Sequence, residues 1–339
     1  MRFNTRPIRD TSLQLPTLGF GAAPLGGLFN GVDDAQAADT LATAFKSGLR
    51  YVDTAPFYGF GLSERRVGDV LRGQDYVLST KVGRLLHPGA APDPASLGWP
   101  EALPFHPVFD YSYDGIMRSF EASLQRLGLA RIDILYVHDI GPETHGAGNA
   151  QYFEALEKSG YRALEDLRRD GRVQAIGIGV NETQVCADAL EIGDWDVFLL
   201  AGRYTLLEQT PLDGLFAKCA RHKVSVVVGG PFNSGVLVGG DTWNYGAVPE
   251  AVRARVTQLS QLCQAFQVPL AAAALQFPLG HDVVVSVIPG LRNLQELSDT
   301  LEWAACDIPD AFWQALKDRN LLHPDAPTPT GAPFLEMRA

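Results

Sequence analysis

Residues 51–59 read Tyr-Val-Asp-Thr-Ala-Pro-Phe-Tyr-Gly and introduce the pattern that the rest of the chain repeats. The first two side chains favour extended backbone, so the stretch predicts a short strand that ends at Asp53. The proline and glycine that follow favour a turn, and Ser63 is a candidate N-cap for the next helix. Asp53 and Tyr58 then share one loop at the carboxyl end of a strand, where α/β proteins place their sites. By itself the stretch is equally compatible with a capping acid beside a half-buried aromatic ring.

The unit of a strand followed by a helix recurs about eight times along the chain. After a short extended piece at 13–15, strands are predicted at residues 17–21, 51–53, 76–80, 132–137, 173–179, 195–200, 224–228 and 283–287. The later strands are almost continuous apolar runs, which is typical of parallel strands buried on both faces. Candidate caps of the intervening helices include Asp33 or Asp34, and Asp114. Eight alternations without a domain break predict one (β/α)8 TIM barrel over residues 1–339, with long loops at its carboxyl-end face.

A doubly wound sheet is the alternative fold. It would carry a glycine-rich fingerprint after its first strand and an acidic residue roughly 20 positions later. Residues 19–24 read Gly-Phe-Gly-Ala-Ala-Pro, with proline at the position of the third glycine, and no such acidic residue is evident. The sequence also contains no Walker-type phosphate-binding motif, so the barrel is favoured.

Composition narrows the class of partner. The 339 residues are 46% hydrophobic and 20% charged, which is ordinary for a globular protein. The formal net charge of −11 argues against nucleic acid or an anionic membrane as the main partner. No apolar run approaches the ~18 residues of a membrane helix, and the first residues lack an apolar signal core, so a cytoplasmic location is predicted. The cysteines show neither CxxC nor metal-ligand spacing, which predicts reduced thiols and no metal site.

Two segments interrupt the alternation. Residues 84–112 contain six prolines, with Trp99 and Phe105 between them. Long loops inside compact domains are usually functional or disordered, and these aromatic side chains favour a loop that packs over the barrel mouth. The proline-rich residues 324–339 are predicted to form a tail over the surface.

Four ionisable side chains follow three successive strands. Asp53 and Tyr58 follow the first of these strands, Lys81 follows the second and His138 follows the third. In a barrel these carboxyl ends meet at one mouth. A lysine cation within hydrogen-bond reach would lower the phenol's pKa, ordinarily near ~10, and a carboxylate would hold that lysine in place. A histidine opposite can bond a carbonyl or hydroxyl oxygen, so the set predicts a proton-transfer site around Tyr58.

The same residues have other interpretations. A lysine after a strand is often a solvated charge, a histidine after Tyr-Val is often a core residue, and Asp53 can be a cap. Lys81 is also a candidate Schiff-base lysine of a barrel aldolase, which Asp53 and Tyr58 fit less well. The occurrence of all four residues on successive strands favours the proton-transfer site.

These residues resemble the catalytic tetrad of the aldo-keto reductase superfamily. The matching stretches are 53–59, 79–81 and 137–138, and the resemblance extends from residues 18–21 to residues 288–290. The stretches 110–114, 200–209 and 229–235 are similar to the D-threo-aldose 1-dehydrogenase branch, which includes L-fucose and L-galactose dehydrogenases. The resemblance implies hydride transfer with a nicotinamide cofactor that lies extended across the barrel mouth, without a Rossmann fold. It further implies that Tyr58 is the general acid/base, that Lys81 lowers its pKa and pairs with Asp53, and that His138 orients the reacting oxygen.

The resemblance also implies a set of cofactor-binding residues. These are Gly21, Ala22, Asn181, Tyr204, Gly230, Pro231, Phe232, Asn233, Gly235, Pro289, Gly290, Arg292 and Glu296. Asn181 matches the residue that bonds the nicotinamide amide, and Tyr204 is expected near the nicotinamide or the substrate. Members commonly carry glutamine where this chain has Ala201. The loop 230–235 is expected to wrap the pyrophosphate, because its glycines allow close backbone approach to phosphate.

Two positions bear on the adenosine end of the cofactor. Members that prefer NADP often carry lysine and arginine at the positions of Gly290 and Glu296. A carboxylate at 296 would repel a 2′-phosphate and could accept a hydrogen bond from a ribose hydroxyl, although Arg292 lies near in sequence. We therefore predict that this chain uses NAD(P), with NAD favoured.

The branch resemblance implies oxidation of the C1 hydroxyl of a cyclic aldose to its lactone. Phe57, Trp99 and Phe105 are the candidate substrate residues, and the partner is a small-molecule sugar. The alternatives are a pyridoxal 4-dehydrogenase-like or general aldehyde oxidoreductase, and a regulatory subunit that binds cofactor without turnover. The sequence carries no prediction of the oligomeric state.

Overall fold

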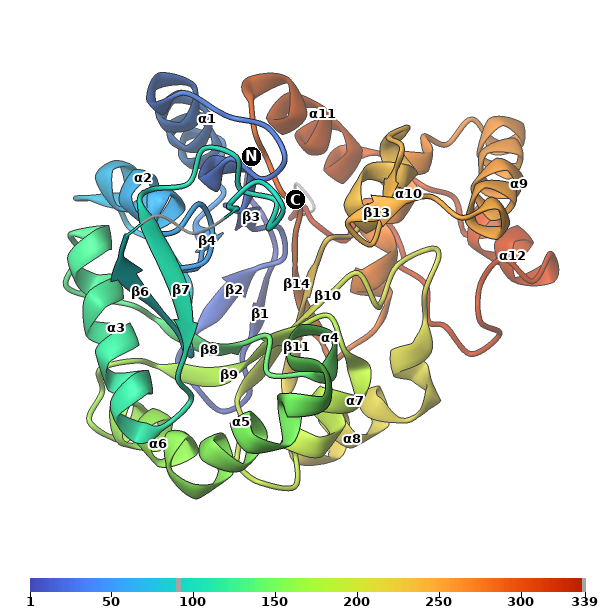
Figure 1. Ribbon diagram of the computed structural model, residues 1–339. Coiled ribbons are helices and arrows are strands. Elements are labelled where there is room, and N and C mark those ends of the chain that lie inside the picture. Colours follow the sequence, from blue (N-terminus) through green and yellow to red (C-terminus); the bar gives the residue numbers. More distant parts are fainter. Residues whose placement is uncertain (90–92, 337–339) are drawn as a thin grey trace.

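Eight parallel strands form a ring around which the helices are arranged (Figure 1). The computed structural model describes residues 1–89 and 93–336. The ring strands are β3 (Phe20–Gly21), β4 (Tyr51–Asp53), β5 (Val77–Val82), β8 (Ile134–His138), β9 (Ala175–Val180), β10 (Val197–Ala201), β11 (Ser225–Gly229) and β14 (Val284–Ile288). Parallel bridges Leu18–Val287 and Gly21–Gly290 join the first and last strands. The predicted (β/α)8 barrel is thus confirmed.

The helices have the following bounds. They are α1 (Asp34–Lys46), α2 (Leu62–Leu71), α3 (Tyr113–Leu127), α4 (Pro142–His145), α5 (Asn149–Ala155), α6 (Tyr161–Arg169), α7 (Thr183–Ala189), α8 (Leu215–His222), α9 (Glu250–Phe266), α10 (Leu270–Gln276), α11 (Leu294–Ala305) and α12 (Asp310–Asp318). Asp33 caps α1 as predicted. Two other predicted caps are wrong, because α2 begins after Gly61 with Ser63 buried inside it, and Ser112 rather than Asp114 caps α3.

Small residues on the inner face of β9 make room for the site above them. The strand reads Ala-Ile-Gly-Ile-Gly-Val and is buried throughout, with its isoleucines in the outer core beneath the helices. A Cβ atom at Gly179 would lie 3.4 Å from Cε of Lys81, so a side chain larger than alanine there would displace the lysine. The glycine at this position therefore leaves space for a long side chain to cross the barrel interior.

A hairpin that the sequence analysis did not predict closes the amino end of the barrel. It consists of β1 (Thr5–Pro7) and β2 (Gln14–Pro16), which pair antiparallel. Ile8, Leu13 and Leu15 join the inward-facing side chains of the ring strands in one buried cluster. The interior of the barrel is therefore filled by side chains at its amino end.

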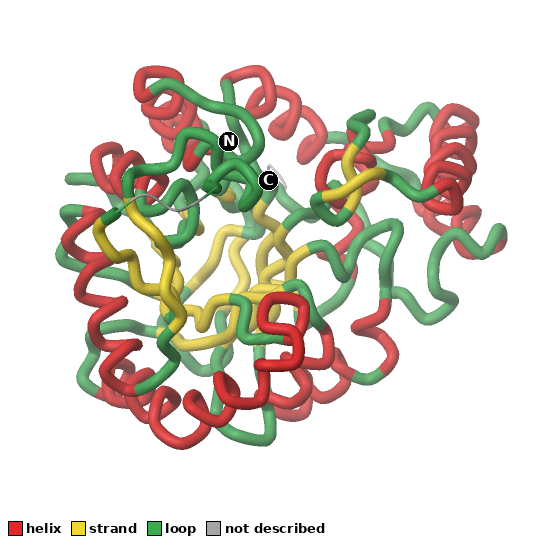
Figure 2. The backbone as a smooth tube through the Cα atoms, in the orientation of Figure 1, coloured by secondary structure: helices red, strands yellow, loops and turns green. Residues whose placement is uncertain are grey.

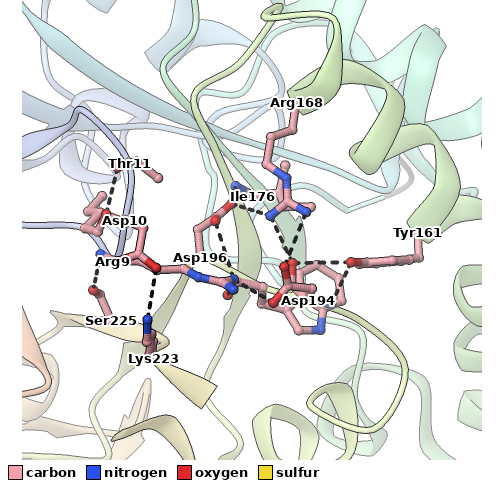
Figure 3. A network of polar contacts seen from close by, with 12 residues as sticks. Arg9, Asp10, Thr11, Tyr161, Arg168, Ile176, Asp194, Asp196, Lys223 and Ser225 are labelled. Atoms are coloured by element: carbon pink, nitrogen blue, oxygen red, sulfur yellow. Dashed lines mark hydrogen bonds and ion pairs between the residues drawn. The ribbon is translucent and has the colours of Figure 1, made fainter. Parts of the chain in front are cut away.

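A network of charges fastens this hairpin to the start of the ring strands (Figure 3). The Arg9 guanidinium lies 2.7 Å from the carboxylate of Asp194 and donates to the Trp195 carbonyl at 2.9 Å. Asp196, which is almost fully buried, accepts hydrogen bonds from Arg168 at 2.8 Å and from the Ile176 N–H at 2.9 Å. Neighbouring strands and the hairpin are thus joined at the end of the barrel opposite its mouth.

Two small antiparallel hairpins project at the mouth (Figure 2). The segment 84–112 was predicted as an irregular loop, but β6 (Arg84–Pro88) and β7 (Phe105–Phe109) pair within it. Positions 90–92 of that segment lie outside the described residues. The second hairpin consists of β12 (Thr242–Trp243) and β13 (Gly246–Ala247). Both bring aromatic side chains to the rim of the barrel.

The predicted tail packs against the first residues of the chain. Phe334 is fully buried, and Leu335 forms an antiparallel bridge with Phe3. Positions 337–339 of the tail lie outside the described residues. Within the described ranges no single helix has the length and apolarity to cross a membrane. One pair of helices, α9 and Leu270–Gly280, has the length and composition of a membrane span when the two are taken together, but the pair is bent by 103°. The same ranges contain no group of three or more metal-ligating side chains.

Candidate active site

Lys81 crosses the interior of the barrel mouth to reach Asp53. Its Nζ donates to Oδ2 of Asp53 at 2.6 Å and to the Thr54 carbonyl at 2.9 Å, and both charged side chains are almost fully buried. Ser79 donates to the other oxygen of Asp53 at 2.7 Å. A buried charge pair needs its remaining polar atoms satisfied, and Ser79 and Thr54 do this here. The pair is therefore a rigid platform beneath the cavity.

Tyr58 lies above this platform, with its ring centroid 4.7 Å from Lys81 Nζ. Burial raises the pKa of Tyr58 well above its ordinary value, the Asp53 carboxylate raises it further, and Arg84 acts in the opposite direction. The protein alone therefore does not lower this pKa as predicted. The physical reason is burial, which disfavours the charged phenolate, and the nearby Asp53 carboxylate acts in the same direction.

His138 faces Tyr58 across the mouth, with ring centroids 5.9 Å apart and nearly perpendicular planes. Burial lowers the pKa of His138 well below its ordinary value, and the Arg84 and Lys81 cations lower it further. The imidazole is therefore neutral at physiological pH and can donate one hydrogen bond without carrying charge. Tyr111 donates to the His138 carbonyl at 2.8 Å, which fixes the end of β8.

A cavity of about 310 Å³ lies between Tyr58 and His138. Of the predicted substrate residues, Phe57 and Trp99 line it, with ring centroids 5.7 Å apart. Phe105 does not line the cavity, since it packs behind Trp99 and Phe60. The apolar walls of the cavity, with few polar groups among them, are typical of a small-molecule pocket.

The cavity opens into a larger groove of about 510 Å³. The groove is lined by ten of the predicted cofactor residues: Gly21, Asn181, Gly230, Pro231, Phe232, Asn233, Gly235, Gly290, Arg292 and Glu296. Three others lie outside it. Ala22 is buried below the surface, and the carbonyl of Pro289 accepts the Gly21 N–H at 2.9 Å as part of barrel closure. Tyr204 is fully buried against Phe216 and Phe277, so the structure does not bring it to the groove.

The loop 230–235 has the conformation of a phosphate cradle. Gly230, Asn233, Ser234 and Gly235 all have positive φ, which turns successive backbone amides away from regular pairing. Asn233 donates through Nδ2 to the Gly202 carbonyl at 3.1 Å, while its Oδ1 is buried without a hydrogen-bond partner among the described residues. Two amides are used inside the loop, since the Asn233 N–H donates to the Gly230 carbonyl and the Gly235 N–H to the Phe232 carbonyl, both at 3.0 Å. The unpaired Asn233 oxygen beside this glycine-containing backbone fits a polar ligand, so the groove suits a dinucleotide.

Glu296 has a structural role as well as a place in the groove. Its Oε2 accepts the Arg292 N–H at 2.7 Å, and Asn293 caps α11 by accepting the Glu296 N–H at 2.9 Å. This arrangement is close to a capping box at the helix start. The carboxylate is therefore fixed at the start of α11, where its charge lines the groove.

Four residues at the site were missed by the sequence analysis. Asp139 and Tyr245 line the cavity, Phe29 lies opposite Tyr245 with ring centroids 6.3 Å apart, and Arg84 supports Asp139 from below. The carboxylate directly after His138 at a strand end was the available signal for Asp139. Phe29 and Tyr245 belong to loops without periodicity, so only the folded chain brings them together.

The fold and this constellation define the class of protein. The chain belongs to the aldo/keto reductase family, whose profile matches residues 17–320. It is 43% identical over 333 residues to pyridoxal 4-dehydrogenase of Microbacterium luteolum, covering 94% of this chain and 97% of the relative. It is 38% identical to D-threo-aldose 1-dehydrogenase of a Pseudomonas species, covering 94% and 96%.

Solved structures agree on the fold. The holo form of aldo-keto reductase AKR11C1 from Bacillus halodurans matches with a TM-score of 0.75 at 23% identity, covering 95% of this chain and 97% of that one. Glycerol dehydrogenase AKR11B4 from Gluconobacter oxydans matches with a TM-score of 0.72 at 20% identity, covering 98% and 99%.

Proposed function

We propose that this oxidoreductase removes hydride from the C1 carbon of a cyclic aldose and so converts the sugar to its lactone. The observation that carries the proposal is the placement of Tyr58 and His138 on either side of a cavity that opens into the dinucleotide groove. Members of the family use NAD(P)(H). The bound nicotinamide ring would supply the hydride acceptor, with Asn181 and the loop 230–235 holding the cofactor.

The chain's own residues perform the proton chemistry. The C1 hydroxyl lies between the Tyr58 phenol and the neutral imidazole of His138. Deprotonated Tyr58 accepts the hydroxyl proton as hydride leaves C1, and His138 donates a hydrogen bond to the reacting oxygen. The Lys81–Asp53 pair keeps a positive charge near the phenol, and the aromatic walls exclude water.

The two relatives suggest a chemistry shared by two substrate classes. Their names refer to D-threo-aldoses and to pyridoxal. An aldose closes to a cyclic hemiacetal, and pyridoxal does the same through its aldehyde and neighbouring hydroxymethyl group. Oxidation of either hemiacetal gives a lactone. Pyridoxal is therefore the second candidate substrate, and the higher identity to the pyridoxal enzyme favours testing it beside the sugars.

NAD is the proposed cofactor. Glu296 holds a carboxylate in the groove, where it disfavours a 2′-phosphate. A cytoplasmic location is supported by the four cysteines, all of which are free.

An absorbance screen for NADH and NADPH formation tests the function. It should compare L-fucose, L-galactose and D-arabinose with pyridoxal and simple aldehydes. Turnover of sugars supports the proposal, turnover of pyridoxal alone replaces the substrate, and no turnover with any compound favours a non-catalytic subunit. Tyr58→Phe should lower kcat by roughly 10²–10⁴-fold while NAD binding, followed by tryptophan fluorescence, persists. Loss of NAD binding in that variant would contradict the assigned role.

A further inference from the structure

Asp139 presents a carboxylate to the substrate cavity beside His138. Its φ of 46° lies in the left-handed region, which aspartate tolerates better than most residues. Its N–H still donates to the Gly179 carbonyl at 2.9 Å, so strand pairing extends to this residue. The chain then turns sharply out of β8, and the side chain reaches the cavity that Tyr58 and His138 face.

The two oxygens of this carboxylate have different surroundings. Oδ2 accepts a hydrogen bond from Arg84 and lies 3.3 Å from Nε2 of His138. Oδ1 accepts no hydrogen bond from the described residues, and it is not fully buried. The side chain of Asp139 is 23% exposed, while that of Arg84 is only 5% exposed. One oxygen is thus committed to the protein, and the other is unpaired on a side chain that lines both this cavity and the adjoining one beside Glu143.

Arg84 holds the carboxylate rigidly. Its guanidinium lies 4.0 Å from the ring centroid of Phe57 and 5.2 Å from that of Phe109. A guanidinium held between two aromatic rings and paired with a carboxylate has little freedom to move. Oδ1 of Asp139 is therefore fixed next to His138, which bonds the reacting oxygen of the substrate. Binding of a ligand does not have to order this carboxylate first.

We propose that Asp139 is a specificity-determining residue whose Oδ1 accepts a hydrogen bond from a substrate hydroxyl one or two carbons from the reacting carbon. The inference rests on the proposed function. In an aldose this donor is the 2-hydroxyl, and in pyridoxal it is the ring hydroxyl. A plain aldehyde lacks the donor and would leave a desolvated carboxylate oxygen unpaired, which a site built around hydrogen bonds penalises strongly.

Matched substrates that differ only in this hydroxyl test the inference. The pair is L-fucose and 2-deoxy-L-fucose, or pyridoxal and 3-deoxypyridoxal if the wild type oxidises pyridoxal and no aldose. The measurement is the ratio of kcat/KM for the hydroxylated substrate to that for its deoxy analogue. Asp139→Ala should lower the ratio by roughly 10- to 100-fold, because a hydrogen bond to a charged group is lost. Asp139→Asn should lower it by a smaller factor, since its amide keeps a weaker bond.

Two controls separate this role from damage to the fold. Thermal unfolding shows whether each variant is folded, and Asp139→Asn keeps an oxygen for Arg84 if Asp139→Ala does not fold. Glu143→Gln changes a carboxylate that lines the adjoining cavity but not this one, and it should leave the ratio unchanged. A ratio within twofold of wild type in the folded Asp139 variants overturns the inference while the proposed function stands. Absence of wild-type turnover overturns the proposed function instead.

Discussion

Tyr58 combines a phenol whose pKa is raised by burial and by Asp53 with a lysine ammonium 4.7 Å from its ring. Because burial disfavours the phenolate, the residue is a neutral acid at physiological pH. That state is suited to donating a proton during carbonyl reduction. Oxidation requires the opposite protonation state, in which the phenol must first lose its proton.

The pH dependence of the reaction follows from the raised pKa of Tyr58. Because the pKa of Tyr58 is raised, its deprotonated fraction is small near neutrality and grows as pH rises toward that pKa. We expect kcat/KM for oxidation to increase toward alkaline pH, and kcat/KM for reduction to stay level until pH approaches the raised pKa. The lowered pKa of His138 keeps the imidazole neutral at neutral and alkaline pH, so this histidine adds no transition there. Initial rates in both directions across a buffer series measure this. An oxidation rate that is flat or falls with pH would contradict it.

At the scale of elements, one arginine of α2 holds the loop that leads into α1. Arg66 is nearly buried and donates to the carbonyls of Leu25 and Val32, at 2.5 and 2.6 Å, and to Asp34 at 2.8 Å. The loop between these carbonyls carries Leu28 and Phe29 to the cavity and the groove. The shape of the mouth thus depends on a side chain that does not line it.

Arg66→Met should therefore raise the KM for cofactor several-fold and lower the free energy of unfolding by about 2–4 kcal/mol, because buried carbonyls lose their donors. Arg65→Met is the matched control, since the neighbouring Arg65 is 44% exposed and, within residues 1–89 and 93–336, its side chain pairs with Asp34 alone. It should cost less than about 1 kcal/mol and leave the KM unchanged. Urea unfolding and steady-state kinetics measure both effects. Equal effects in the two variants would show that Arg66 does not hold the loop.

The start of α11 carries the proposed cofactor preference. Glu296→Gln keeps an oxygen that can accept the Arg292 N–H but removes the negative charge. We expect the ratio of kcat/KM for NADP to that for NAD to rise by about three- to tenfold, since roughly 1 kcal/mol of repulsion is relieved. Glu302→Gln, at an exposed position later in α11 that does not line the groove, is the control. A wild type that already prefers NADP would contradict the argument.

Some elements of the fold and site can be predicted from the sequence, and others cannot. The ring strands follow from apolar runs, and Asp53, Lys81 and His138 follow from their positions at strand ends. The hairpin β6–β7 could not be predicted, because prolines hide its pairing and no alternation marks it. The cap of α3 was misplaced because Ser112 and Asp114 are both good capping residues, and only the folded backbone distinguishes them. The pKa of Tyr58 depends on burial and on the exact placement of the Lys81–Asp53 pair, which no local pattern contains.

For the whole molecule, stability and catalysis lie at opposite ends of the barrel. The network of Arg9, Arg168 and Asp196 joins the amino-end hairpin to β9 and β10 (Figure 3). Asp196→Ala would leave the buried Ile176 N–H without its acceptor and would remove the hydrogen-bonded carboxylate partner of Arg168, which keeps its bond to the Asp194 carbonyl. We expect a loss of about 2–4 kcal/mol in the free energy of unfolding, with kcat/KM of the folded enzyme unchanged.

Asp194→Ala is the control at this end. Its side chain is 64% exposed, so its pairing with Arg9 is screened and should contribute less than about 1 kcal/mol. Urea unfolding of both variants, with activity measured under native conditions, makes the comparison. A loss of kcat/KM in folded Asp196→Ala would show that the two ends are coupled.

The amino-end hairpin also dictates when the barrel can be completed during synthesis. Arg6 donates to the carbonyls of Leu279 and Val284, and Ser286 donates to the Pro16 carbonyl, so the earliest segment is held by one of the last. Contacts so distant in sequence form late, because the intervening chain must first be ordered. On the ribosome the hairpin therefore cannot complete its packing until β14 has emerged, and Ile8, Leu13 and Leu15 stay incompletely buried until then. Nascent chains that stall before residue 284 should accordingly be the species that chaperones retain.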